Sequence, residues 1–355
     1  MKNKILIVLF CLYVFGFGFY SLIDNDKEIS LTERRKLDTF PKVELTNEYA
    51  DKLDSYLVDQ FPLREEYRSI KANYNYYVLN MLVNNNIYIK DNYIFKSEYP
   101  TNISSVDNLK KHLNKTKSKF DKKNNVYMLL VPDKNYYLES EEFLNIDYDY
   151  IYDEIKDVDG IKFIDIRNLM NISDYYETDT HWKQENLGKV VNALVTNMGY
   201  EYKMVDYEVN EYEKFYGVYY GESAIKRNPE VLKYLINEEI NKVKVEHLES
   251  GKSNKVYNTE KLIGMDSYDV YLDGATAYIE ITNDNTKSKK ELIMFRDSFG
   301  SSLAPLLIPY YKKITIIDNR YINSDYYLQK VDFKKQDVLF VYSTLIANNS
   351  FTLKN

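Results

Sequence analysis

The sequence predicts an α/β fold with helices packed in layers around a largely parallel central sheet, and three observations support this. Short apolar runs alternate with segments in which apolar residues recur at helical spacing. The chain has 355 residues, enough for one large domain or two modest ones. Its hydrophobic fraction is 45% and its charged fraction 28%, which excludes both disorder throughout and a polytopic membrane protein.

Charge and cysteine content narrow the classes of function. Lys and Arg number 47 and Asp and Glu 54, so the net charge is −7, which gives no electrostatic reason to bind nucleic acid. Cys11 is the single cysteine, which excludes a disulfide framework and a Cys-rich zinc site within the chain. The 37 tyrosines could mark a sugar-binding surface, but codon bias explains the same excess.

The first segment is an uncharged run over residues 5–23, preceded by Lys2 and Lys4. At about 1.5 Å per residue such a helix reaches close to 30 Å and can cross a bilayer. Its end is bulky, which favours an uncleaved transmembrane signal-anchor over a removed signal peptide; a buried core helix is the remaining alternative. The two lysines predict a cytoplasmic tail over 1–4, with residues 24–355 outside the cytoplasmic membrane.

The rest of the chain divides into a juxtamembrane stem over 24–60 and a large folded domain over 61–355. Phe40-Pro41 and Phe61-Pro62 interrupt the charged stem, because a residue before proline avoids the helical conformation. Within the domain, runs of strand length alternate with amphipathic helices. The predicted strands are 126–131, 161–166, 292–295, 314–317 and 338–342, and the predicted helices are 105–120 and 186–198.

The stretch over about 201–290 breaks this alternation and reads as an inserted β-rich lobe or lid. It combines a charged, helix-like piece at 229–241 with strand-like pieces at 243–248, 270–272 and 277–281. Its tyrosines are either candidates for stacking against sugar rings or ordinary packing residues; examples are Tyr216, Tyr219 and Tyr220.

Asp179 and His181 form the first candidate site. Residues i and i+2 of an extended segment point the same way, so the Asp179 carboxylate can accept a hydrogen bond from Nδ1 of His181. Nε2 is then free to act as a base near neutral pH. Two other interpretations stay open: a helix-capping Asp beside an incidental His, and a metal-ligand pair, although no further His or Cys cluster completes a zinc site.

Ser298 forms the second candidate site, at the point where an apolar run meets a helix-compatible segment. A turn of this kind presents the hydroxyl at the carboxyl edge of a parallel sheet, where α/β proteins bind ligands. The backbone N–H of Ser298 can stabilise an oxyanion, and Gly300 lets the turn pack tightly. A serine that caps the helix over 300–307 is the alternative. With Asp179 and His181, Ser298 predicts a Ser-His-Asp triad.

These two segments together resemble the DHHW family, which is akin to the SGNH-type O-acetyltransferases of bacterial exopolysaccharide (alginate-type) acetylation. Thr180 stands where the family's name motif has a His, but a side chain between Asp179 and His181 points away from the triad. Four further motifs extend the resemblance over nearly the whole chain after the apolar run: Glu33-Arg34-Arg35-Lys36-Leu37 with Phe40-Pro41, Asp59-Gln60-Phe61-Pro62-Leu63-Arg64, Val131-Pro132-Asp133-Lys134 and Ile317-Asp318-Asn319-Arg320.

The resemblance implies an SGNH-hydrolase-like catalytic domain in permuted order, with Asp-x-His before Ser. It implies transfer of an acetyl group through an acyl-serine intermediate to a polysaccharide, a membrane-bound O-acyltransferase as the acetyl supplier, and no cofactor or metal. Arg320, Lys134 and Trp182 are then candidates for substrate binding, while an ion pair with Asp318 or Asp297 explains Arg320 equally well. Two alternatives remain: a polysaccharide acetyl esterase, and a non-catalytic glycan-binding component of an export complex.

Overall fold

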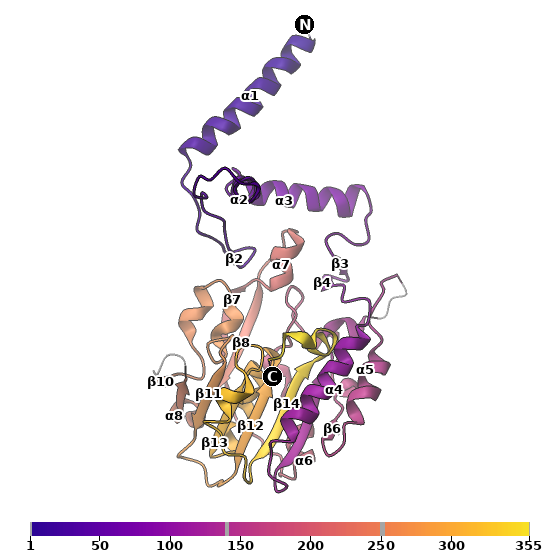
Figure 1. Ribbon diagram of the computed structural model, residues 1–355, viewed down its shortest axis with the longest axis vertical. Coiled ribbons are helices and arrows are strands. Elements are labelled where there is room, and N and C mark those ends of the chain that lie inside the picture. The colour runs from indigo at the N-terminus through magenta and orange to yellow at the C-terminus, as the bar shows by residue number, and fades with distance from the viewer. Residues whose placement is uncertain (1, 139–141, 249–252, 355) are drawn as a thin grey trace. The chain divides into compact units, whose positions relative to one another are not determined.

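The computed structural model describes residues 2–138, 142–248 and 253–354, so Met1 of the predicted tail lies outside the described residues. The chain forms two compact units (Figure 1). The first consists of Met1–Asn85 with Tyr220–Asn228, and the second of Asn86–Tyr219 with Pro229–Asn355. The predicted boundary between stem and catalytic domain at residue 60 therefore falls inside the first unit.

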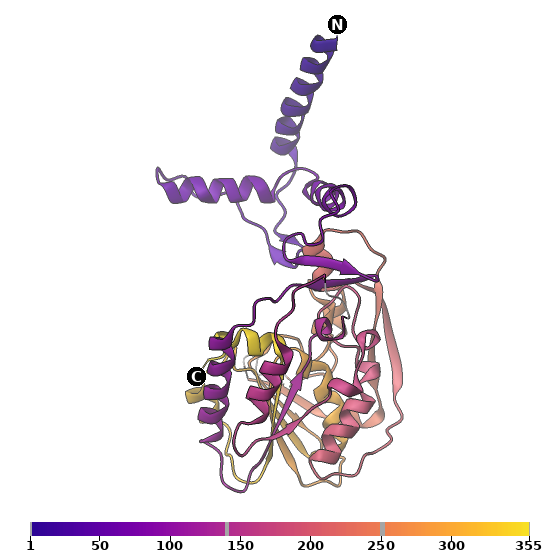
Figure 2. The ribbon, with the colours of Figure 1, turned by 90° about the vertical axis from the view of Figure 1, so that its right-hand side faces the viewer.

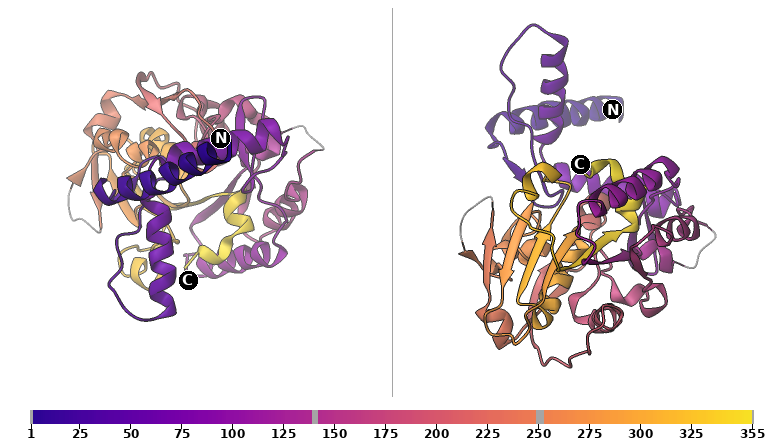
Figure 3. Two further views of the ribbon diagram at one scale, coloured as in Figure 1. Left: turned by 90° about the horizontal axis from the view of Figure 1, so that it is seen from above. Right: turned by 60° about the horizontal axis from the view of Figure 1, so that its bottom comes forward.

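A sheet of seven strands, extended at one edge by a two-residue eighth, forms the centre of the second unit (Figure 1, Figure 3). Its strands are β5 (Asn125–Val131), β6 (Lys162–Ile164), β9 (Lys244–His247), β10 (Ser253–Asn254), β11 (Tyr278–Thr282), β12 (Glu291–Arg296), β13 (Lys313–Ile317) and β14 (Asp337–Ser343). Their order is β10-β9-β11-β13-β12-β14-β5-β6. The five strands from β13 to β6 are parallel, and the other three continue the sheet in antiparallel fashion.

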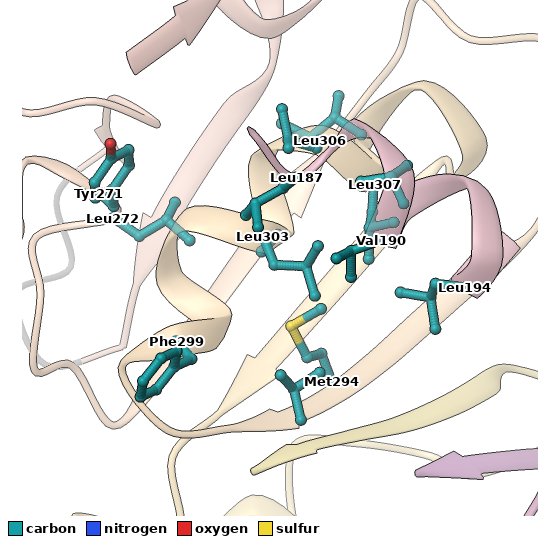
Figure 4. Packing of buried hydrophobic residues seen from close by; sticks show 14 of the residues in the cluster. Leu187, Val190, Leu194, Tyr271, Leu272, Met294, Phe299, Leu303, Leu306 and Leu307 are labelled. Carbon is teal, nitrogen blue, oxygen red and sulfur yellow. The ribbon is translucent and has the colours of Figure 1, made fainter. Parts of the chain in front are cut away.

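Helices cover both faces of this sheet because its central strands carry apolar side chains on both sides. On one face lie α4 (Ile103–Lys117), α5 (Tyr148–Lys156) and α11 (Thr344–Asn348), and on the other α6 (Gly188–Asn197) and α9 (Phe299–Leu307). Along β12, Met294 packs toward α6 and α9, whereas Ile293 and Phe295 pack toward the opposite face, as the two-residue period of a strand requires. Figure 4 shows Met294 with Leu303 and Val190.

The predicted α/β fold with a mostly parallel sheet is confirmed. Each of the five strands predicted from apolar runs corresponds to one of the parallel strands, and both predicted helices are present as α4 and α6. The smaller elements of the second unit are β3 (Ile87–Lys90), β4 (Tyr93–Lys96), β7 (Glu208–Phe215), β8 (Glu230–Ile236), α8 (Glu238–Lys242) and α10 (Ser324–Tyr327).

The prediction for 201–290 needs three corrections. β9 and β11 belong to the central sheet rather than to a separate lobe. The predicted helix over 229–241 is mostly strand, since β8 pairs with β7 and only Glu238–Lys242 is helical. The predicted strand over 270–272 is reduced to one isolated antiparallel bridge, from Tyr271 to Tyr257, because Val270 ends the 3₁₀ helix Ser267–Val270. Short apolar runs suit helix and strand alike, and here the pairing partner decided between them.

The first unit contains the N-terminal apolar helix. Its elements are α1 (Lys2–Ile23), β1 (Ile29–Ser30), β2 (Arg35–Lys36), α2 (Asn47–Asp59), α3 (Arg64–Asn73) and the π-helical turn η1 (Tyr74–Val78); α7 (Val218–Ser223) begins in the second unit and ends in the first. Residues Lys4–Ser21 of α1 have a mean hydropathy of 1.9, and none of this window is buried. A helix of this length and composition serves as a signal sequence or as a membrane anchor.

Two of the family-like motifs contact each other in the first unit through ion pairs. Asp59 accepts hydrogen bonds from the Arg35 guanidinium and from the backbone N–H of Asp38. Glu33 binds Arg64 at 2.6 Å and Arg68 at 3.1 Å. The Arg35 hydrogen bond, outweighing desolvation, lowers the pKa of Asp59. These motifs therefore fasten the segment after α1 to α2 and α3.

Candidate active site

Ser298 lies at the turn from β12 to α9, at the carboxyl edge of the parallel strands. The Asp297 carboxylate shapes this turn, because it accepts hydrogen bonds from the backbone N–H groups of Phe299 at 3.0 Å and Ser343 at 2.7 Å. At Gly300 a Cβ atom would lie 2.5 Å from Cβ of Arg296, so no larger residue fits without a shift. The backbone N–H of Ser298 has no hydrogen-bond partner among the described residues.

The side chains of Asp179, His181 and Ser298 meet in one hydrogen-bonded chain. Oδ1 of Asp179 lies 2.6 Å from Nδ1 of His181, and it also accepts the backbone N–H of His181 at 3.0 Å. Nε2 of His181 lies 2.7 Å from Oγ of Ser298. Because a carboxylate only accepts, Nδ1 carries the proton and Nε2 is left to accept the serine hydroxyl. This order of contacts can activate the hydroxyl as a nucleophile.

The triad is buried at Asp179 and His181 and accessible to solvent at Ser298. Asp179 is fully buried and His181 is 7% exposed, while Ser298 is partly exposed. The Tyr268 ring stacks on the imidazole with centroids 3.8 Å apart and planes 7° apart. Burial raises the pKa of Tyr268, whose hydroxyl donates to Oγ of Ser302 at 2.7 Å. Tyr268 therefore fixes the ring plane of His181. Its hydroxyl is directed to Ser302 and does not compete for the proton of the imidazole.

Sequence reasoning missed the groups that hold the loop carrying Asp179. The Glu230 carboxylate accepts hydrogen bonds from the backbone N–H groups of Glu177 and Thr178, at 2.7 and 2.8 Å, and from the Thr178 hydroxyl at 2.6 Å. Oδ2 of Asp179 accepts the backbone N–H of Val218 at 2.8 Å. Tyr268, Glu230 and Val218 come from the 201–290 stretch, and nothing in their local sequence distinguishes them from its other residues.

Lys134 lies beneath the same loop and is 1% exposed. Its Nζ donates to the carbonyl oxygens of Tyr176 and Glu177 at 3.1 and 3.0 Å, and it lies 4.9 Å from the centre of the Tyr219 ring. Burial lowers the pKa of Lys134 to about 7, although the charge of Asp179 opposes that shift. The predicted role of Lys134 in substrate binding does not fit this position, and Tyr219 is likewise packed inside.

Trp182 and Arg320 also have partners within the protein. Trp182 is fully buried, and its Nε1 donates to Oγ of Ser302 at 2.9 Å, so it packs the core beside the triad rather than facing a substrate. The guanidinium of Arg320 forms two hydrogen bonds with the carboxylate of Asp318, at 2.9 and 2.7 Å. This ion pair is one of the two interpretations that the sequence left open for Arg320.

We expect Glu230→Gln to loosen the loop that carries Asp179. The amide replaces one of two accepting oxygens with an NH₂ group that faces N–H or O–H donors. Leaving a buried polar group unpaired costs about 1–3 kcal/mol, and because Glu230 is only partly buried its loss should fall toward the lower end of that range. The variant should therefore unfold at lower urea concentration and turn over an acetyl ester more slowly than the wild type. Glu201→Gln, at an exposed position, is the matched control. If both variants unfolded at the same urea concentration, Glu230 would not stabilise this loop.

Comparison with known proteins places the fold. No protein-family model matches the sequence, and no curated protein matches it. A DHHW family protein from Eubacterium siraeum has a TM-score of 0.63 at 19% identity, covering 77% of this chain and 97% of that one. Bacillus cereus PatB1 has a TM-score of 0.57 at 18% identity, covering 74% and 96%. PatB1 with a sulfonyl adduct has a TM-score of 0.58 at 20% identity, covering 77% and 100%.

This likeness over most of the chain confirms the structural resemblance to the DHHW family that the motifs predicted. At these identities it establishes the shared fold, and the chemistry of the site must be argued from the side chains.

Proposed function

We propose that the chain is a membrane-anchored, extracytoplasmic O-acetyltransferase. It moves an acetyl group through an acyl-serine intermediate at Ser298 to hydroxyls of an exported or cell-surface polysaccharide. The observation that carries the proposal is the pair of contacts from Asp179 to His181 and from His181 to Ser298, at 2.6 and 2.7 Å. The resemblance to the DHHW family supports acetyl as the transferred group.

The first half of the reaction acylates the serine. Oγ of Ser298 attacks the acetyl carbonyl carbon of the donor while its proton passes to Nε2 of His181, and Asp179 stabilises the imidazolium that forms. The backbone N–H of Ser298 is available to the oxyanion. The bond to the leaving group then breaks, and the leaving group takes the proton from His181.

The second half deacylates the enzyme. A sugar hydroxyl gives its proton to Nε2 of His181 and its oxygen bonds to the acetyl carbon, after which Oγ of Ser298 leaves and regains the proton. Water in place of the sugar would make the same site an esterase. Transfer therefore requires an acceptor that is held better than water.

Location and partners complete the proposal. We infer that α1 anchors the chain, with residues 1–4 in the cytoplasm and the catalytic unit outside, because Lys2 and Lys4 precede the apolar span. A membrane-bound O-acyltransferase would supply acetyl groups from the same membrane.

The test is the acetyl content of the cell-surface polymer in a strain that lacks the gene. A transferase predicts a fall that the wild-type gene restores and Ser298→Ala does not. A rise would instead identify an acetyl esterase. Unchanged acetyl content, together with no labelling of Ser298 by a fluorophosphonate or a sulfonyl fluoride, would identify a non-catalytic component.

A further inference from the structure

The first unit exposes an apolar surface that the proposed chemistry does not use. Its residues 72–85 contain no charged side chain, in a chain whose charged fraction is 28%. Of the long uncharged runs after α1, 298–311 and 338–353 are mostly buried. By contrast, Tyr77 and Val78 are each 61% exposed. Exposed apolar surface of this extent marks a place of interaction.

α3 continues into η1 as one helix of the first unit (Figure 1, Figure 2), and its exposed apolar residues recur along it at helical spacing. The opposite side is occupied, because Ser69 and Ala72 are buried and Arg68 donates to the carbonyl of Gly221 at 2.9 Å. We call the exposed side the apolar face of α3–η1; its members are Leu63, Ile70, Tyr74, Tyr77 and Val78, each at least 50% exposed.

The apolar face begins beside α1. The ring of Phe61 stacks on Phe17 of α1 with centroids 5.8 Å apart, and the ring of Tyr67 lies 6.0 Å from Phe17. The hydroxyls of Tyr13 and Tyr67 are 3.3 Å apart. Phe17 lies six residues before the end of α1, about 9 Å along the axis at 1.5 Å per residue. Tyr13 lies ten residues before that end. The start of α3 therefore contacts the C-terminal half of α1, inside its apolar span.

We propose that the apolar face of α3–η1 lies in the outer interface of the lipid bilayer, as a second membrane contact besides α1. The proposal rests on the membrane anchoring in the proposed function. Continuity with α1 selects lipid as the occupant, because whatever surrounds the outer end of α1 also meets the start of α3. Tyrosines with apolar neighbours are typical of the membrane–water interface.

The chemistry of the face predicts how it binds lipid. Arg64 and Arg68 are held in ion pairs with Glu33, and the exposed Lys71 is offset by the exposed Glu66. Apolar burial rather than attraction to anionic headgroups must therefore hold the face in place. Its insertion should therefore be nearly the same in phosphatidylcholine vesicles with and without anionic lipid, and should persist at high salt.

The experiment places a fluorescent reporter on the face of the full-length chain. Cys11 is the single cysteine, so Cys11→Ser gives a background in which Ile70→Cys, Val78→Cys or the control Lys111→Cys, at an exposed position of α4, is labelled alone with an environment-sensitive dye. The protein is reconstituted into phosphatidylcholine vesicles and probed with a lipid spin-labelled near the carbonyl region and with aqueous iodide. We expect the labels at 70 and 78 to be quenched severalfold more by lipid, and less by iodide, than the exposed control at 111.

Two results would overturn the proposal. Labels at 70 and 78 that are as open to iodide as the label at 111 would place the face in water. Labels shielded from both quenchers would show that protein, a second copy or another chain, covers it. Flotation of the same vesicles after carbonate washing tests the anchor separately: loss of flotation refutes anchoring by α1, whereas retained flotation with labels in water refutes only the lipid contact of the face.

Discussion

Ser298→Ala should lower turnover of an acetyl ester such as p-nitrophenyl acetate by about 10³–10⁶-fold, the range found when other triads lose a member. The variant lacks the oxygen that lies 2.7 Å from Nε2 of His181, so no acyl-enzyme can form. The fold should persist, because the turn depends on Asp297 and Gly300 rather than on this hydroxyl. The measurement is the steady-state rate of the full-length protein, with its melting temperature as the check on folding.

Ser301→Ala is the matched control for that experiment. Ser301 lies in the same helix, is 1% exposed, and its hydroxyl has no hydrogen-bond partner among the described residues. Its loss should leave turnover within a few-fold of wild type. Wild-type turnover in the Ser298 variant would show that Ser298 is not the nucleophile, whatever the distances.

Asp179→Asn should lower the same turnover by about 10⁴-fold, as expected when the orienting carboxylate of a triad becomes an amide. If the amide NH₂ faces Nδ1 of His181, the imidazole takes the tautomer whose Nε2 carries a proton and cannot accept one from Ser298. If the amide NH₂ group faces away from His181, it meets the backbone N–H of Val218, which donates to Oδ2 at 2.8 Å in the wild type. Either orientation disrupts the relay.

Asp165→Asn is the control for this second variant, because Asp165 is an exposed carboxylate in an ion pair with Arg167. Turnover should be close to wild type there. Covalent labelling of Ser298 by a fluorophosphonate gives a second readout, which should slow in Asp179→Asn while the melting temperature shows that the variant is folded. If labelling and turnover both stayed at the wild-type level, Asp179 would have no part in orienting His181.

The parallel strands could be predicted from the sequence because their pattern is local. Strands buried on both faces need nearly continuous apolar residues, and the runs at 126–131 and 338–342 meet that need without help from distant segments. The segment 230–236 carries no such signal. Its apolar residues suit a helix as well as a strand, and only pairing with β7 made it a strand.

The candidate site, like the fold, could be predicted from the sequence only in part. Asp179, His181 and Ser298 were found because few residue types perform this chemistry, and because each lies next to a recognisable element. Trp182 follows His181 directly, and Lys134 belongs to another of the family-like motifs, yet both side chains are buried. A motif identifies a residue but does not say which way its side chain faces. Glu230 and Tyr268 were missed because they act only through contacts with segments more than fifty residues away.

The amino-acid sequence alone determined the apolar N-terminal span, the parallel strands and the types of side chain available for proton transfer, because each depends on residues adjacent along the chain. Only the tertiary structure decided that residues 117 positions apart meet at 2.7 Å, that a carboxylate from β8 holds the loop that carries Asp179, and that an aromatic ring fixes the histidine. Such contacts form when strands pair and helices pack, so their distances depend on the whole fold.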